Sequence, residues 1–263
     1  MDQIASSPLD DMDRRPMINQ KPDYGLDGPG LVRALLVVGL VSAIVGLLLL
    51  RWVPNAHAAD AAGYALVSFG LLCFTFASLM FASSRFGKFR ARDRLLAGLK
   101  LRGDETVLDV GCGRGLLLIT VAKLLPRGRA VGIDLWSQRD LSANSREATM
   151  KNAALEGVAH RVSVHDGDMR ELPFPDRSFD AVVTHFAIHN VRASEGRRAA
   201  IREIVRTLKP GGQVALSDIH PFVSLYADEL RRSGMIDVNI SDLSFWTFPP
   251  ARTVTARKPS RSV

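Results

Sequence analysis

The residues with the clearest chemical potential form the stretch VLDVGCGRG, which occupies positions 107–115. An apolar run typical of a buried strand leads into three glycines, and a helical pattern follows over residues 116–125. A glycine turn at the start of a helix lets a ligand approach the backbone closely, because no Cβ stands in the way. The stretch therefore predicts a site for a nucleotide-like ligand.

The spacing of the glycines narrows the kind of ligand. A dinucleotide site of the form Gly-x-Gly-x-x-Gly needs glycine where Leu116 stands, and the chain has no Gly-x-x-x-x-Gly-Lys loop for a triphosphate. Asp109 precedes Gly111 at the end of the predicted strand, where its carboxylate would repel a pyrophosphate and attract a cation. We therefore expect a ligand that carries positive charge near Asp109.

Further acids follow the next two predicted strands. Asp134 ends the second strand, where an acid can accept hydrogen bonds from ribose hydroxyls, although it can equally cap a helix. Trp136 is either a wall for a flat base or a core residue. Asp168 and Met169 belong to an acidic cluster after the third strand, where a carboxylate can accept from an exocyclic amine. A solvated turn is the alternative for that cluster.

Three histidines lie near the ends of the fourth and fifth strands. His185 and His189 follow the fourth strand and His220 follows the fifth, so each is a candidate general base. For any one of them, a structural, hydrogen-bonded role competes with that function. The i, i+4 spacing of His185 and His189 suits a metal on a helix, but the chain lacks the Glu of His-Glu-x-x-His there. We expect no metal.

Alternating strand and helix patterns position these residues. The predicted strands cover residues 106–110, 130–134, 161–164, 179–184 and 213–218, and the predicted helices cover 116–125, 144–155 and 197–208. Such alternation indicates βαβ units, hence an α/β, doubly wound domain with a parallel sheet from residue 101 onward. In such a sheet the ligand lies beyond the carboxyl ends of the strands, where the acids and histidines fall.

Five motifs in this order resemble class I S-adenosylmethionine-dependent methyltransferases, especially the quinone-biosynthesis and sterol-like branch. They are VLDVGCGRG, GIDLW, DGDMRELPF, FDAVVTHFAIHNV and EIVRTLKPGGQVALSDI, and the resemblance covers residues 101–258. It implies a Rossmann-like, seven-stranded sheet whose last strand, over residues 253–258, runs antiparallel. It also implies S-adenosyl-L-methionine as the cofactor.

The resemblance further implies a role for each matching position. The methionine end of the cofactor would be held by Asp109 with the backbone at Gly111 and Gly113, and the transferring methyl would lie beside Thr184 or His185. The implied cofactor-binding residues are Asp109, Gly111, Gly113, Asp134, Leu135, Asp168, Met169 and Thr184. The candidate catalytic residues, from the chemistry of a general base, are His185, as a base or for acceptor positioning, and His189. The sequence after strand four, THFA, lacks the Asn-Pro-Pro-Tyr of relatives that methylate bases or glutamine.

The first third of the chain has a different composition. Residues 1–30 indicate a flexible tail, and two almost wholly apolar runs over residues 31–53 and 61–82 are each long enough to cross a bilayer core of about 30 Å. Two alternatives remain open. One is a buried helical hairpin in a soluble protein; the other is a signal peptide cleaved after residues 56–58. The run at 31–53 is long for a signal peptide and follows an acidic segment.

The distribution of charge indicates the partners. The net charge is +7, and five cations (Arg85, Lys88, Arg90, Arg92 and Arg94) crowd the linker 83–100 just after the second run. The positive-inside rule then places the domain in the cytosol, with the cations close to anionic headgroups. Because no aromatic residues alternate with a basic stripe, we expect no nucleic-acid partner. Two cysteines make a disulfide framework improbable.

These patterns predict an integral membrane methyltransferase with two transmembrane helices and a cytosolic domain at residues 101–263. It would transfer a methyl group to a small, amphiphilic or lipid-like acceptor by in-line displacement. Three alternatives stay open: the same enzyme acting on a soluble small molecule, a non-catalytic membrane interaction protein with a decayed fold, and a nicotinamide oxidoreductase. The identity of the acceptor and the oligomeric state are not predicted.

Overall fold

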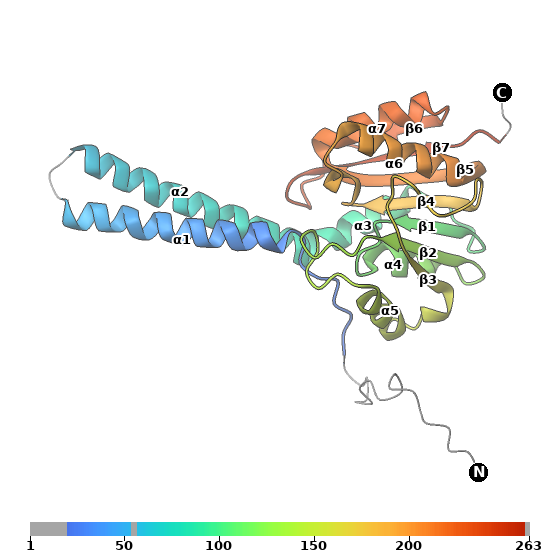
Figure 1. Cartoon of the computed structure of the whole chain (residues 1–263), viewed down its shortest axis with the longest axis horizontal. Helices are drawn as coiled ribbons and strands as arrows, with labels where there is room; N and C mark the ends of the chain where they lie inside the picture. The colour runs from blue at the N-terminus through green and yellow to red at the C-terminus, as the bar shows by residue number, and fades with distance from the viewer. Residues whose placement is uncertain (1–19, 54–56, 261–263) are drawn as a thin grey trace, which may run out of the picture.

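The computed structural model describes residues 20–53 and 57–260, which form a helical hairpin and an α/β domain (Figure 1). The hairpin projects from one edge of the domain. Its helices are α1 (Pro29–Trp52) and α2 (His57–Ala82); a π-helical turn (Ser83–Gly87) continues α2 into α3 (Lys88–Ala97). The domain adds helices α4 (Leu116–Leu124), α5 (Arg146–Leu155), α6 (Ser194–Thr207) and α7 (His220–Arg232).

The domain is built on one seven-stranded sheet in the order β3-β2-β1-β4-β5-β7-β6. The strands are β1 (Thr106–Val110), β2 (Arg129–Asp134), β3 (Val162–Asp166), β4 (Phe179–His185), β5 (Leu208–Ile219), β6 (Ile236–Ile240) and β7 (Ala251–Arg257). The first five are parallel, whereas β7 is antiparallel to β5 and to β6. The sheet confirms the predicted doubly wound fold with an antiparallel last strand.

Helices cover both faces of the sheet. Helices α6 and α7 bury Ile201, Ile204, Tyr226 and Leu230 against one face, and α3, α4 and α5 cover the other. Both faces of the central strands are therefore dry, which explains why β1, β4 and β5 are apolar at consecutive positions. Side chains alternate across each strand, so Leu108 and Val110 pack beneath α6 and α7 while Val107 packs beneath α4.

The two hairpin helices pack tightly through glycines. A Cβ built on Gly46 would lie 2.6 Å from the Gly63 carbonyl oxygen, and one on Gly70 would lie 2.7 Å from the Gly39 oxygen. Both helices are long and apolar enough to cross a membrane, and only 17% of each apolar window is buried. Most of their large apolar side chains therefore face outward, unlike those of a core helix in a soluble protein.

A close-packed joint fixes the base of the hairpin to the domain. The Ser83 hydroxyl accepts a hydrogen bond from the Phe248 backbone N–H at 2.9 Å, and the rings of Phe76 and Phe248 lie 5.4 Å apart. Gly87 presses against the backbone of Trp246, where a Cβ would come within 1.8 Å of the carbonyl oxygen. The orientation of α2 relative to the sheet is therefore set by backbone contacts.

This joint yields a stability prediction. Gly87→Ala should lower the melting temperature of the full chain in detergent by several degrees, because overpacking costs about 1–3 kcal/mol. Gly30→Ala is the matched control, since it adds the same methyl group to a helix at a position with no atom within 4 Å. Equal melting temperatures for the two variants, measured by differential scanning calorimetry, would contradict the tight joint.

Candidate active site

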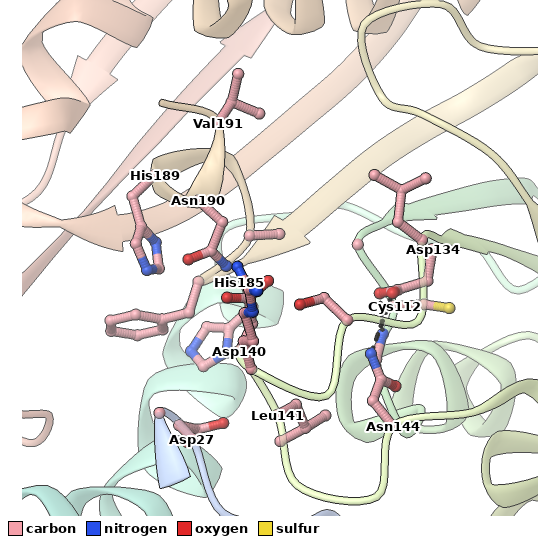
Figure 2. A pocket seen from close by; sticks show the side chains of 18 of the residues that line it. Asp27, Cys112, Asp134, Asp140, Leu141, Asn144, His185, His189, Asn190 and Val191 are labelled. Atoms are coloured by element: carbon pink, nitrogen blue, oxygen red, sulfur yellow. Dashed lines mark hydrogen bonds between the residues drawn. The ribbon is translucent and has the colours of Figure 1, made fainter. Parts of the chain in front are cut away.

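A cavity of about 780 Å³ lies beyond the carboxyl ends of β1, β2 and β4. Its size is within the range of about 300–1,000 Å³ that small-molecule sites occupy. Figure 2 shows Asp134 and Asn144 on one side of the cavity, with His185, His189 and Asn190 on the other. The cavity therefore brings together most of the residues predicted from the strand ends.

The glycine turn joins β1 to α4 in a left-handed backbone conformation. Gly111, Gly113 and Gly115 all have positive φ, which a residue with a side chain rarely adopts. A Cβ on Gly111 would lie only 2.3 Å from the Ala187 Cβ, so this glycine is required by the approach of the segment after β4. Gly111 and Gly113 both line the cavity, as predicted for a turn that faces a ligand.

Asp109 is a buried carboxylate beneath this turn. It lines the cavity, is 2% exposed, and its Oδ2 atom has no hydrogen-bond partner among the described residues. Burial, with a contribution from the charge of Asp134, raises the pKa of Asp109 to about 8. A cation bound here would satisfy the lone oxygen and restore the ionised form, so the site favours a ligand with an ammonium group.

Asp134 at the end of β2 organises the neighbouring wall. Its carboxylate accepts hydrogen bonds from the N–H of Gly113 (2.8 Å), the N–H of Trp136 (2.6 Å) and the amide of Asn144 (3.1 Å). Burial raises its pKa even though these donors oppose the shift. Asp134 is not a helix cap, since Ser145 caps α5. The Asn144 Oδ1 atom, buried and without a partner among the described residues, provides another acceptor at the cavity.

The remaining predicted cofactor residues divide into two groups. Leu135, Asp168 and Met169 line the cavity, and Asp168 forms a two-pronged ion pair with Arg170 that lowers its pKa. Thr184 is 2% exposed and is not among the cavity-lining residues. Trp136 also lies outside the lining; it packs against the core, and its indole N–H donates to Asp166.

The two candidate histidines have different environments. His185 lines the cavity with a shielded Nε2 that has no partner among the described residues, and burial lowers its pKa to about 4, so it is neutral near pH 7. His189 also lines the cavity, and its Nδ1 lies 2.6 Å from Oδ1 of Asp218. Burial of the ring opposes protonation, but the hydrogen bond and charge of Asp218 prevail and raise the pKa of His189.

Asp218 at the end of β5 is fully engaged in holding this histidine. Besides the His189 ring, it accepts hydrogen bonds from the N–H of His189 (3.0 Å), the N–H of Ile219 (2.8 Å) and the hydroxyl of Tyr226 (2.9 Å). Because a carboxylate can only accept, the His189 Nδ1 carries the proton and Nε2 is left as an acceptor. Sequence reasoning missed Asp218 and Tyr226, although Asp218 directly follows the apolar run of strand five.

A strap formed by residues 20–28 closes another side of the cavity. Tyr24, Asp27 and Gly28 line the cavity, and Leu26 is hydrogen-bonded to Ser142 through both its N–H and its carbonyl oxygen. Composition had placed these residues in a flexible tail; residues 1–19 of that tail lie outside the described part of the chain.

Lys88 is one of the five cations that were predicted to lie close to lipid headgroups, and the structure shows that this prediction is wrong for Lys88. Its ammonium is 6% exposed and donates to the carbonyl oxygens of Tyr24 (2.8 Å) and Gly25 (2.7 Å), so it holds the strap and cannot reach a lipid headgroup. Arg85, Arg90 and Arg94 remain exposed, and the guanidinium of Arg90 lies 3.9 Å from the centre of the Trp246 ring.

Comparison with known proteins agrees with this geometry. Residues 107–212 match a family model described as a methyltransferase domain. The chain is 26% identical over 177 residues to a demethylmenaquinone methyltransferase of Lactobacillus johnsonii, a match that covers 64% of this chain and 69% of that protein. It is 36% identical over 129 residues to the 27-O-demethylrifamycin SV methyltransferase of Amycolatopsis mediterranei, covering 49% of this chain and 44% of the relative.

A solved structure extends the likeness to the fold. The crystal structure of the 4+2 cyclase SpnF matches with a TM-score of 0.55 and 21% identity, covering 66% of this chain and 82% of that one. At this identity the match concerns the fold alone. The fold and the cavity thus define a Rossmann-like methyltransferase architecture. Together with the family match, they show that the chain carries an S-adenosylmethionine-dependent methyltransferase domain, whose cofactor is S-adenosylmethionine.

The burial of Asp109 yields a prediction with opposite effects on binding and stability. Asp109→Asn should abolish binding of S-adenosylhomocysteine in calorimetry, because the ammonium loses its counter-ion. The same change should raise the melting temperature of the ligand-free protein at pH 7, because Asp109 ionises freely in the unfolded chain at this pH while its pKa of about 8 keeps it protonated in the folded protein, and this difference costs folding stability.

The pH dependence provides the control for that prediction. Wild-type affinity should fall roughly tenfold per unit as the pH drops below about 8, since a proton must leave Asp109 before the ammonium binds. The ligand's own ammonium limits binding only at higher pH. If Asp109→Asn keeps its affinity for S-adenosylhomocysteine, or if the wild-type affinity is constant from pH 6 to 8, Asp109 does not bind the ammonium group.

Proposed function

We propose that this protein is a membrane-anchored methyltransferase that moves the methyl group of S-adenosylmethionine to a small amphiphilic acceptor, with His189 as the general base. One observation carries the proposal. A single cavity is lined by the buried carboxylate of Asp109, by His189 and by Leu31 and Met80 at the base of the apolar hairpin.

The arrangement of His189 supports its assignment as the base. Asp218 holds the ring in the tautomer that leaves Nε2 free to accept a proton from a hydroxyl or acidic carbon of the acceptor. His189 replaces His185 as the preferred base, because the lowered pKa of His185 makes it a weak acceptor of protons. His185 then has a positioning role through its unpartnered nitrogen.

Little covalent chemistry is required of the protein itself. S-adenosylmethionine supplies a methyl group on a sulfonium, which is already a good leaving group. Asp109 and the glycine turn would hold its methionine end, while Asp134 and Asn144 face the nucleoside side of the same cavity. Phe186 and Phe222 flank the His189 ring, which helps to exclude water from the reacting atoms.

The hairpin supports a membrane anchor with the domain on the cytosolic side. Its outward apolar residues have no protein partner in the described chain, and the exposed arginines Arg85, Arg90 and Arg94 lie just beyond α2. The strap argues against a cleaved signal peptide. Cleavage after residues 56–58 would remove Tyr24, Asp27 and Leu31, which line the cavity.

The names of the relatives support the class of acceptor. One curated relative is a demethylmenaquinone methyltransferase and another is a 27-O-demethylrifamycin SV methyltransferase, so both names indicate a small organic molecule as the acceptor. The two matches cover 69% and 44% of these proteins. The match to the family model starts at residue 107, after the hairpin. We therefore extend to this chain the class of acceptor rather than either compound.

The base assignment predicts a specific kinetic pattern. His189→Ala and Asp218→Asn should each lower kcat by about 10²–10⁴-fold with little change in affinity for S-adenosylhomocysteine. His220→Ala is the matched control, because this histidine lies outside the cavity lining. In the wild type the acidic limb of kcat/KM should lie above pH 6.5, and Asp218→Asn should move it to lower pH. A profile that is identical in both proteins would exclude His189 as the base.

The membrane assignment is tested with the whole protein. Membranes from cells expressing the full chain should retain the protein through carbonate washing and, given methyl-labelled S-adenosylmethionine, yield label in the organic-solvent extract. Membranes with the Asp109→Asn variant are the matched control and should yield none. Extraction of the protein by carbonate would contradict the anchor, and label found only in water-soluble products would contradict the amphiphilic acceptor.

A further inference from the structure

The end of the cavity nearest the hairpin is built from apolar side chains of two distant segments. Leu31 and Met80 come from the domain ends of α1 and α2, and Phe248 and Pro249 come from the loop before β7. These four residues form what we call the hairpin mouth. The same cavity is also lined by polar residues, with Ser83 and Thr247 next to the hairpin mouth and His185, His189 and Asn190 at and after the end of β4.

We propose that the hairpin mouth is a lateral portal that receives the hydrocarbon tail of the acceptor directly from the bilayer while the polar head reaches His189. This inference rests on the proposed function, and it adds the route and the tail-binding residues. An apolar group at the base of the hairpin and a polar group around the end of β4, in one cavity, match the two ends of an amphiphile that lies across the membrane interface.

The position of the mouth along the helices supports this route. Leu31 lies two residues after the start of α1 at Pro29, and Met80 lies two residues before the end of α2 at Ala82. Two exposed arginines lie nearby, Arg33 on α1 and Arg85 in the π-helical turn after α2, and their long cationic side chains can reach the lipid headgroups. Leu31, which is 56% exposed, then lies at the boundary of the hydrocarbon core.

Two residues of the mouth, Phe248 and Met80, differ in how firmly they are held. Phe248 is fixed by the Ser83 hydrogen bond and by contact with the Phe76 ring. Met80 lies opposite the strap, with its terminal methyl 3.3 Å from the position of a Cβ on Gly28. Since methionine is unbranched and flexible, its side chain can adjust to tails of different shape. A rigid, larger side chain at position 80 would close the mouth.

The neighbouring residue offers a matched control for this closure. Leu79 is 43% exposed on the same helix and is absent from the cavity lining, so it faces outward beside the mouth. Met80→Trp and Leu79→Trp therefore add similar bulk at adjacent positions, one inside the proposed portal and one outside it. Both variants should retain the wild-type affinity for S-adenosylhomocysteine, which reports on the cofactor end of the cavity.

The test compares two acceptors in nanodiscs that contain anionic lipid. One is a naphthohydroquinone head with a tail of several prenyl units, and the other is the same head without a tail. Met80→Trp should lower the ratio of kcat/KM for the tailed over the tailless acceptor at least tenfold, whereas Leu79→Trp should leave that ratio unchanged. An unchanged ratio in Met80→Trp, or the same fall in Leu79→Trp, would overturn the portal.

A binding measurement keeps the portal separate from the proposed reaction. An alkyl phenol with a photoreactive diazirine on its ring should label residues 185–193 in the wild type and in Leu79→Trp, and this labelling should be lost in Met80→Trp. Labelling that persists in Met80→Trp, or that is confined to α1 and α2 in the wild type, would refute the portal. Failure of the wild type to methylate either hydroquinone would count against the proposed acceptor class alone.

Discussion

A buried ammonium group ties the hairpin of this protein to its cofactor cavity. Lys88 begins α3, the helix that continues α2, and its Nζ atom donates to two carbonyl oxygens of the strap that leads into α1. Burial lowers its pKa, and Asp27, 3.7 Å away, opposes that shift. Removing the ammonium would leave carbonyl groups unsatisfied in a protein interior, where each costs about 1–3 kcal/mol. The strap, both hairpin helices and the cavity wall thus share one anchoring point.

The cavity combines two electrostatic regions with opposite needs. On the side of β1 and β2, Asp109 and Asp134 are carboxylates with raised pKa, short of compensating positive charge. On the side of β4 and β5, the carboxylate of Asp218 is saturated by four donors and increases the basicity of a histidine. The first region is suited to hold a cation, and the second is suited to remove a proton. Both follow from strand ends that meet at one edge of a parallel sheet.

The sequence predicted those parts of the fold that depend on local patterns. The glycine turn and the apolar strands were found where expected, because each has a short-range signature, whereas the antiparallel last strand was expected from the family resemblance. Helix α7 and strand β6 were not predicted, although Val223, Tyr226, Ala227 and Leu230 recur at helical spacing. In strand β6, Ile236, Val238 and Ile240 alternate with polar residues, but this pattern spans only five residues at the edge of the sheet.

The site was harder to predict where it depends on contacts between distant segments. The pairing of His189 with Asp218 joins residues 29 positions apart, and it requires β4 and β5 to be neighbours. Lys88 resembles its neighbours in a basic run, and nothing in the charge pattern distinguishes the one cation that is buried. Thr184 and His185 are adjacent, yet strand alternation turns only His185 toward the cavity.

The strap also determines when, during synthesis, the cavity can be completed. It precedes α1 in the chain, but its hydrogen-bond partners come much later. Leu26 is bonded to Ser142, 116 residues further on, and Asp23 is bonded to Asn152, 129 residues further on. During synthesis both hairpin helices leave the ribosome long before these partners exist. The strap can therefore close the cavity only after the hairpin, β1, β2 and α5 have been synthesised. The order of the chain therefore places the synthesis of the hairpin before the completion of the cavity.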